Sequence, residues 1–292
     1  MANNISLKKG IMLTASFLFL VVLITVITSE KIYAAGAKMV NVSPGTVYNE
    51  YDFTGDNIPD SFVVYKSLDY DNCAVKIRVF INGKICLDKE YWGFDSTMKI
   101  IRFRNGSVFL YQNVDVEDNN GKPNAIYKYD RGSLKIVCDL NKIITKRTGS
   151  RFSELRSVKG NTLNIRHTVM SFTTGATFLD LKAVSKNGKI TVKNKPSKIW
   201  VSKRTKNGEI KYRPKNKYTI SRNTKIYARY NSKRAKYTFA RGTKVKLVRA
   251  VIIKNQLFVK IRNTRNGKTG WLKNYKHVKM YTPVFKEAVY AG

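Results

Sequence analysis

Oxygen-bearing side chains recur at alternate positions in the short stretch between Asp52 and Asp60. With Asp52 as position 1, Thr54, Asp56 and Asp60 occupy positions 3, 5 and 9, and Ile58 at position 7 joins the set through its backbone. A hard cation such as calcium takes about six or more oxygen ligands, and one loop with alternating donors can supply most of them. The stretch therefore predicts a calcium site. An Asx turn held by side-chain hydrogen bonds, without a metal, is the alternative.

Residues suited to catalysis are few. The only histidines are His167, inside an alternating apolar run, and His277, among lysines near the C-terminus. A cysteine peptidase needs a nucleophilic Cys paired with a His, but Cys138 lies in an apolar run that predicts a buried strand. A zinc hydrolase needs several ligands that two isolated histidines do not supply, and no carboxylate pair stands out for glycoside cleavage. The sequence predicts a protein that is not an enzyme.

Basic and aromatic residues gather in residues 223–281. Lys244, Lys246, Lys260 and Arg262 alternate there with the apolar residues Val245, Leu247, Leu257, Val259 and Ile261. This period of two marks half-buried strands with one dry face and one basic face. The ligand-binding residues that we predict on this segment are Tyr227, Arg229, Tyr230, Lys260, Arg262 and Trp271. The last of them, Trp271, is also expected to fill a small core.

Charge is spread unevenly along the chain. The formal net charge is +36, and residues 186–292 contain 31 Lys and Arg against 2 acidic residues. Residues 38–185 contain 21 Lys and Arg against 16 acidic residues. Such asymmetry favours a polyanion as the partner of the C-terminal half, whereas charge that only keeps the protein soluble is the alternative.

The elements that position these residues are predicted to be β-strands throughout. Asn82-Gly83, Arg131-Gly132 and Asn187-Gly188 each precede a strand-like run and recur about every 50 residues. Three such units are too few for an ordinary closed propeller. We therefore expect an all-β chain with a blade-like antiparallel β-domain at 38–192, a basic linker or edge hairpin at 193–222, a small barrel at 223–281 and a tail at 282–292.

The N-terminus has the pattern of an export signal. Lys8 and Lys9 precede an uncharged, mostly apolar run at 11–28, and small residues follow up to Ala37. This order predicts a secretory signal peptide at 1–37 that is cleaved. An uncleaved membrane anchor is the alternative, since the run is near the lower limit for spanning a bilayer.

The cysteine count argues against a disulfide framework. The chain has three cysteines, Cys73, Cys86 and Cys138. In a hairpin that turns at Asn82-Gly83, Cys86 is expected opposite Val79 and too far from Cys73 for a bridge. All three are expected to be small apolar residues in the interior.

Two stretches resemble known families. Thr224–Ala228, Tyr237–Val245, Phe258–Ile261 and Gly267–Leu272 resemble a bacterial SH3 domain. That resemblance implies a small β-barrel that targets exported proteins to the cell wall or peptidoglycan. Residues 52–65 resemble the Asp-rich loop of FG-GAP and VCBS repeats, which implies a calcium-binding or scaffold module rather than catalysis.

The patterns and resemblances together predict a secreted, non-catalytic protein of the Gram-positive wall. Its expected partner is peptidoglycan or a polyanion similar to teichoic acid. One alternative is an extracellular nucleic-acid binder, because Tyr212, Tyr218, Tyr227, Tyr230 and Tyr237 interleave with Lys and Arg and could stack on bases. Another is an accessory subunit of a separate cell-wall hydrolase.

Overall fold

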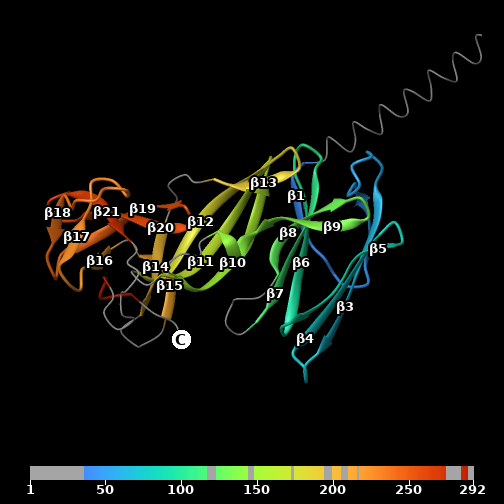
Figure 1. The fold of residues 1–292 in the computed structure, drawn as a ribbon, viewed down its shortest axis with the longest axis horizontal. Coiled ribbons are helices and arrows are strands. Elements are labelled where there is room, and N and C mark those ends of the chain that lie inside the picture. Colours follow the sequence, from blue (N-terminus) through green and yellow to red (C-terminus); the bar gives the residue numbers. More distant parts are fainter. Residues whose placement is uncertain are drawn as a thin grey trace, which may run out of the picture.

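The computed structural model describes residues 36–116, 123–143, 148–171, 174–193, 199–204, 210–215, 217–273 and 284–288 (Figure 1). These residues form several antiparallel sheets, and their only helical element is a single 3-10 turn, η1 (Leu140–Lys142). The all-β prediction is confirmed at this level. No helix among them is long and apolar enough to cross a membrane. Residues 1–35 of the predicted leader lie outside the described residues.

Three consecutive antiparallel meanders make up the N-terminal two thirds of the chain. The first sheet contains β2 (Val47–Tyr51), β3 (Asp60–Asp69), β4 (Ala74–Ile81) and β5 (Lys84–Trp92), in that order. The second contains β1 (Lys38–Asn41), β6 (Asp95–Arg102), β7 (Val108–Asp115), β8 (Asn124–Asp130) and β9 (Ser133–Asp139). The third contains β10 (Thr148–Lys159), β11 (Thr162–Ser171), β12 (Gly175–Lys186) and β13 (Lys189–Val192), and is extended from β12 by β14 (Ile199–Arg204) and β15 (Ile210–Lys215).

Two-residue turns explain the sequence period. Three hairpins, β4–β5, β8–β9 and β12–β13, each turn at a pair of residues that both have positive φ: Asn82-Gly83, Arg131-Gly132 and Asn187-Gly188. Positive φ at both central residues is typical of the type I′ turn, whose twist matches that of the flanking strands. The predicted turns are confirmed, and they occupy corresponding places in the three meanders.

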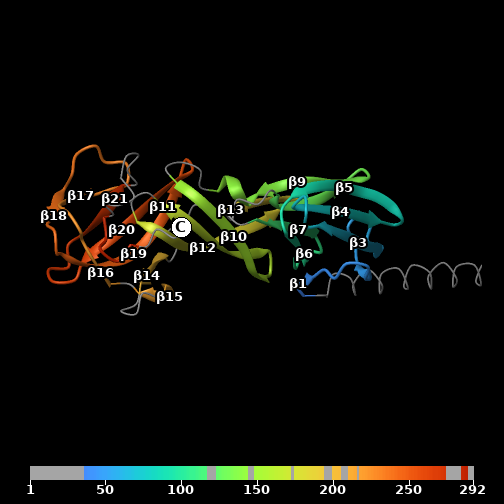
Figure 2. The same ribbon diagram turned by 90° about the horizontal axis from the view of Figure 1, so that it is seen from below.

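The second sheet is the middle layer. Successive residues of β7 point to opposite sides, so Val108 and Leu110 join the core shared with the first sheet, whereas Phe109 and Tyr111 join the core shared with the third. Strands of a sheet that is buried on both faces have continuous apolar sequences instead of alternating ones. Figures 1 and 2 show the resulting order along the long axis, from β2–β5 through β6–β9 to β10–β13.

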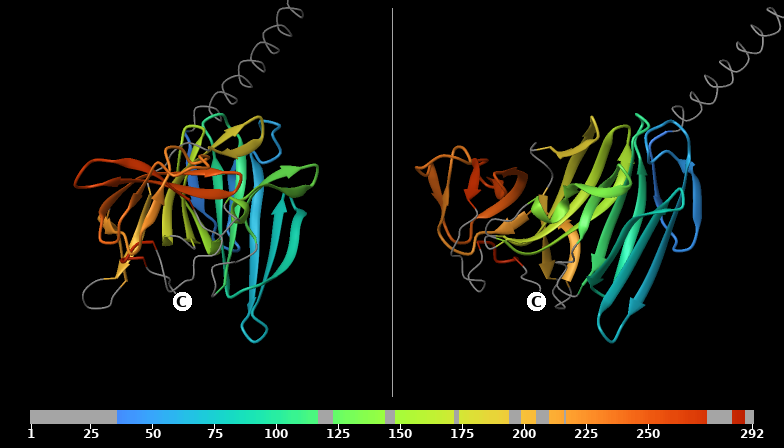
Figure 3. Two further views of the ribbon diagram at one scale, coloured as in Figure 1. Left: turned by 60° about the vertical axis from the view of Figure 1, so that its left-hand side comes forward. Right: turned by 45° about the vertical axis from the view of Figure 1, so that its right-hand side comes forward.

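The C-terminal unit, defined as residues 217–273 and 284–288, has two sheets. One contains β16 (Lys217–Thr219), β19 (Lys244–Ile253), β20 (Gln256–Asn263) and β21 (Thr269–Lys273), and the other pairs β17 (Thr224–Ile226) with β18 (Tyr237–Phe239). Figure 3 shows this unit beside β14 and β15, at the end of the molecule away from β2–β5. The expected linker at 193–222 thus contains β14, β15 and β16, and Phe285 from the expected tail pairs with Ile220.

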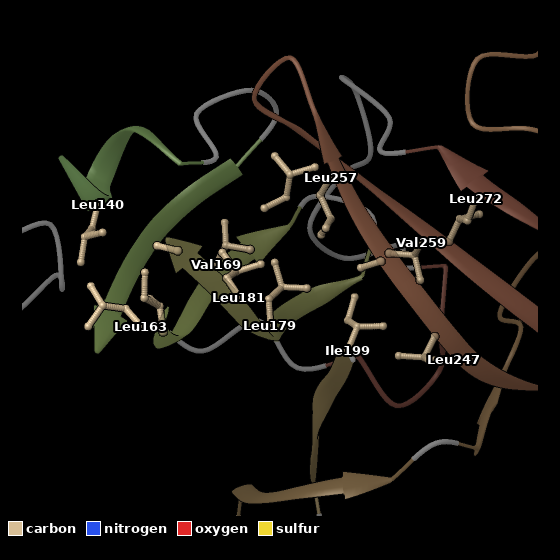
Figure 4. Close-up of a cluster of buried hydrophobic side chains, with 14 of the residues drawn as sticks. Leu140, Leu163, Val169, Leu179, Leu181, Ile199, Leu247, Leu257, Val259 and Leu272 are labelled. Carbon is tan, nitrogen blue, oxygen red and sulfur yellow. The ribbon is translucent and has the colours of Figure 1, made fainter. Parts of the chain in front are cut away.

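A single apolar cluster joins the third sheet to the C-terminal unit. Leu179, Leu181 and Ile199 belong to the same cluster as Leu247 and Leu257 of the β19–β20 hairpin. Figure 4 shows these side chains facing one another across the junction. Burial of apolar area at about 25 cal/mol per Å² gives this junction a share in the stability of both parts.

The first sheet contains one departure from the expected register. Val79 pairs with Leu87 and Phe80 with Ile85, so Cys86 lies in a β-bulge instead of opposite Val79. The expected pairing was wrong because an inserted residue shifts the register. Cys73, Cys86 and Cys138 all lie in the described part of the chain and are free thiols.

Candidate binding surfaces

The Asp-rich loop, residues 52–60, joins β2 to β3 and is organised around Asp60. This carboxylate is 2% exposed and accepts hydrogen bonds through Oδ2 from the backbone N–H groups of Phe53 (2.6 Å) and Thr54 (2.9 Å). Its Oδ1 accepts from Asn82 Nδ2 at 2.6 Å and from Thr54 Oγ1 at 3.3 Å. A buried carboxylate is stable only with such partners, so Asp60 ties the loop to the β4–β5 turn.

The other two aspartates close local turns. Asp52 Oδ1 accepts from the N–H of Gly55 at 2.5 Å, and its Oδ2 accepts from the N–H of Asn57 at 2.8 Å. Asn57 adopts a φ of 67°, the left-handed conformation that Asn tolerates better than most residues. Asp56 Oδ1 accepts from the N–H of Ile58 at 2.9 Å. These are the contacts of Asx turns.

The predicted calcium ligands are therefore only partly brought together. Thr54 Oγ1 lies 3.4 Å from Asp52 Oδ1 and links Asp52 to Asp60. The Asp56 carboxylate instead accepts a hydrogen bond from the backbone of its own turn, and Ile58 is 64% exposed. Among the described residues no group of three or more His, Cys, Asp and Glu is placed to hold a metal ion. Because N–H groups already occupy several carboxylate lone pairs, calcium would have to replace some of these hydrogen bonds.

Strands β20 and β21 bring three of the predicted ligand-binding residues to the C-terminal unit's outer face, where Tyr230 from the β17–β18 loop joins them. Leu257, Val259 and Ile261 are buried, so Lys260 and Arg262 point outward with Phe258. Lys260 pairs across the sheet with Trp271, and Phe258 pairs with Lys273. We call the side chains of Tyr230, Phe258, Lys260, Arg262 and Trp271 the aromatic-basic face.

Aromatic contacts fix the centre of this face. The Tyr230 ring lies 5.5 Å from that of Phe258 and 5.9 Å from that of Trp271, the latter with planes at 85°. Edge-to-face pairs of this kind are favourable beyond their buried area. Phe258 was missing from the predicted set, although the same alternation that points Lys260 outward identifies it.

Trp271 does not fill the core as expected. Its neighbour Leu272 is 1% exposed and packs inward, whereas Trp271 is half-buried on the outer face. Gly270 explains why Leu272 points inward and Trp271 outward. A Cβ at position 270 would come within 2.8 Å of the Tyr227 carbonyl oxygen and closer still to Ile226 Cγ2. The backbone of Tyr227 crosses β21 at this point, donating to the carbonyl of Trp271 at 3.0 Å and accepting from its N–H at 2.8 Å.

The two remaining predicted residues lie beside the aromatic-basic face in different settings. Tyr227 is 7% exposed, and the Lys273 ammonium lies 4.1 Å from its ring centre. Such a cation–π contact covers the ring. Arg229 is exposed in the loop between β17 and β18, where its N–H donates to Ser232 Oγ at 3.1 Å.

Positive charge dominates the described part of the C-terminal unit. The ion pairs between described residues all lie within residues 38–180. Glu287, an acidic residue of the C-terminal unit, accepts hydrogen bonds from Thr219 N and Oγ1, both at 2.8 Å. A cluster of like charges without carboxylate partners attracts polyanions and loses that attraction as salt rises.

Of the residues considered for catalysis, His167 lies in the interior and Cys138 is half-buried. His167 is fully buried, and its Nδ1 lies 2.6 Å from Ser153 Oγ. The Ser153 carbonyl accepts from Tyr111 Oη and Asn124 Nδ2, both at 3.1 Å, which links the second and third sheets. Burial raises the pKa of the Cys138 thiol to about 11, which keeps it protonated at neutral pH. His277 lies outside the described residues.

Comparison of the chain with protein-family models, with curated proteins and with solved structures finds no match.

Proposed function

We propose that the protein is an exported, non-catalytic binding protein that attaches to an anionic polymer of the bacterial cell wall. The aromatic-basic face of the C-terminal unit carries this proposal. Three aromatic rings, Tyr230, Phe258 and Trp271, lie together, and Lys260 pairs across the sheet with Trp271, with Arg262 next on the same face of β20. Aromatic rings offer surfaces for sugar rings, and the flanking cations attract phosphate or carboxylate groups along the polymer.

In this proposal the C-terminal unit is an SH3-type barrel. The support is the close succession of short strands β16–β21 and the backbone pairing of Tyr227 with Trp271, which brings the smaller sheet to the edge of the larger one. The ligand would be peptidoglycan or a polyanion similar to teichoic acid.

The three meanders would then be an accessory, blade-like scaffold of the FG-GAP type, placed outside the cell by a cleaved leader at 1–37. Calcium at residues 52–60 is part of this proposal, with Asp52, Thr54 and Asp60 as the closest group of oxygen donors. The Tm of chelated and calcium-loaded protein tests that part separately from polymer binding.

The experiment that tests the proposed function is cosedimentation of the purified protein with cell-wall sacculi at about 0.15 M salt. Binding should fall when the anionic polymers are stripped from the sacculi, and it should weaken as salt increases. Weak binding to duplex DNA is expected of any surface this positive, so it does not distinguish a wall-binding protein from a nucleic-acid-binding one.

Nucleic acid is the competing ligand, and the same experiment separates the two. Tyr218 is 1% exposed and Tyr227 is covered by Lys273, so neither offers a free ring for base stacking. A protein that does not cosediment with sacculi but binds single-stranded DNA at the same salt concentration would overturn the wall proposal.

A further inference from the structure

The first two sheets separate at one edge and leave a cavity between β5 and β8–β9. Its volume is about 460 Å³. The wall is mainly apolar, and its lining residues include Leu87, Tyr91, Ala125, Tyr127, Leu134 and Ile136. Small-molecule sites are commonly concave, of this size and mostly apolar, with a few placed polar groups.

The cavity opens directly from the core of the sandwich. Tyr127 and Leu134 belong to the apolar cluster that the first two sheets share, and Leu87 and Tyr91 pack against it. Tyr127 pairs with Ile136 across β8 and β9, which points both side chains to the same side. Burial raises the pKa of both Tyr91 and Tyr127, so both phenols stay neutral in the wall.

A lysine points into this opening from the edge of the first sheet. Lys89 pairs with the fully buried Ile77, and alternation along β5 places it on the inner face between Leu87 and Tyr91. It is nevertheless exposed, because the cavity opens at this point. No ion pair between described residues includes Lys89.

The other charged residue that lines the cavity is already engaged. Asp139 Oδ1 accepts from the N–H of Asn141 at 3.0 Å, and its Oδ2 lies 3.4 Å from the ammonium of Lys142. The cavity therefore combines an apolar wall with one cation whose charge is not balanced. That combination fits a ligand with an apolar tail and an anionic head.

We propose that this cavity binds a single-chain anionic amphiphile, with its acyl tail between the two sheets and its carboxylate at Lys89. This site lies in the accessory domain and is independent of the polymer-binding face. The simpler role for Lys89 is protection of an edge strand, since inward-pointing charges keep exposed edges from pairing with other chains.

The test uses the purified protein and dansylaminoundecanoic acid, whose fluorescence increases and shifts to the blue in an apolar site. We expect saturable binding that dodecanoate displaces below its micelle concentration. Ile136→Asp should weaken binding about tenfold or more, because it places a carboxylate in the cavity. Ile136 is 55% exposed, so the substitution should leave the fold intact.

Ile85→Asp is the matched control. Ile85 is 54% exposed on β5, the edge strand that carries Lys89, but it does not line the cavity. Equal loss of binding in the Ile85 and Ile136 variants, or no loss in either, would show that the probe only adheres to the basic surface and would overturn the proposal.

Lys89→Gln tests the role of the cation. It should weaken displacement by dodecanoate about threefold or more and leave displacement by uncharged dodecanol unchanged. A variant that binds both ligands as before and self-associates would assign Lys89 to edge protection and overturn its role in the site. Binding to lipid vesicles without binding to dodecanoate in solution would also contradict the proposal, since it indicates attachment to a bilayer surface.

Discussion

At the scale of single residues, the aromatic-basic face depends on the direction in which each side chain of β20 and β21 points. Period-two alternation identified Lys260 and Arg262 as outward from the sequence alone. It could not decide between Trp271 and its neighbour Leu272, since both are apolar and the phase of β21 is set by pairing with β20. The close approach of Tyr227 at Gly270 settles that phase.

Substitution of the two neighbours should destabilise the protein to different extents. Trp271→Ala should cost about 1 to 2 kcal/mol of unfolding free energy, because it removes a half-buried ring and its contact with Tyr230, and it should weaken polymer binding. Leu272→Ala should cost about 2 to 5 kcal/mol, because Leu272 is buried. Urea denaturation and cosedimentation measure the two effects. A Trp271→Ala protein that is the less stable of the two would contradict the placement of this ring.

Cysteine reactivity gives a second test at this scale. Burial raises the pKa of Cys138 to about 11 and also raises that of Cys86. Since the thiolate is the form that reacts, alkylation of Cys138 in the folded protein should be slow at neutral pH and should accelerate as the pH rises toward 11. Mass spectrometry after iodoacetamide treatment should find Cys73 modified first. Equal modification of Cys138 at neutral pH would mean that it is accessible.

At the scale of elements, turn chemistry was predictable and strand pairing was less so. The Asn-Gly and Arg-Gly pairs identified the hairpins because few residue pairs accept two positive φ values. The bulge at Cys86 was not predictable, because an extra residue in one strand has no composition of its own. The polar segment at 193–222 was expected to be a linker or an edge hairpin, and β14 and β15 within it form a hairpin at the edge of the third sheet. Its pairing with β12 could not be predicted, because nothing in the polar sequence specifies the partner strand.

Gly270 should be hard to replace, because the chain passes close to it. Gly270→Ala should destabilise the protein by about 1 to 3 kcal/mol, because its Cβ would displace Ile226 and the Tyr227 backbone. Thr269→Ala, one residue earlier in the same strand, is the control and should change stability by less than about 1 kcal/mol. Thermal unfolding followed by circular dichroism measures both. Similar Tm values for the two variants would mean that β17 and β21 do not approach closely.

The Asp-rich loop offers a prediction that separates its two interpretations. Asp60→Ala should destabilise the protein by about 2 to 4 kcal/mol with or without calcium, because it leaves buried N–H groups without an acceptor. If the loop binds calcium, the ion should add about 2.7 kcal/mol at about 100-fold over its Kd, and Asp52→Ala should remove that increment. An unchanged Tm on adding calcium to chelated protein would leave the Asx turns as the whole account of the loop.

At the scale of the whole molecule, the sheets are stacked in chain order and share their cores. Composition and periodicity indicated strands, but not that the second sheet is covered on both sides. That arrangement is set by long-range packing of residues such as Phe109 and Leu163. The same cluster continues into the C-terminal unit, so the aromatic-basic face is held by the rest of the fold rather than by the small unit alone.

The central claim is that the C-terminal face, and not positive charge in general, holds the protein to anionic wall polymer. The most direct measurement compares two double charge reversals in cosedimentation with sacculi at about 0.15 M salt. Lys260→Glu with Arg262→Glu reverses the face, and Lys84→Glu with Lys135→Glu makes the same change in net charge on exposed positions of the first two sheets. We predict that the first pair weakens binding about tenfold or more and that the second leaves it nearly unchanged. Equal weakening by the two pairs, or binding that survives both, would contradict the account.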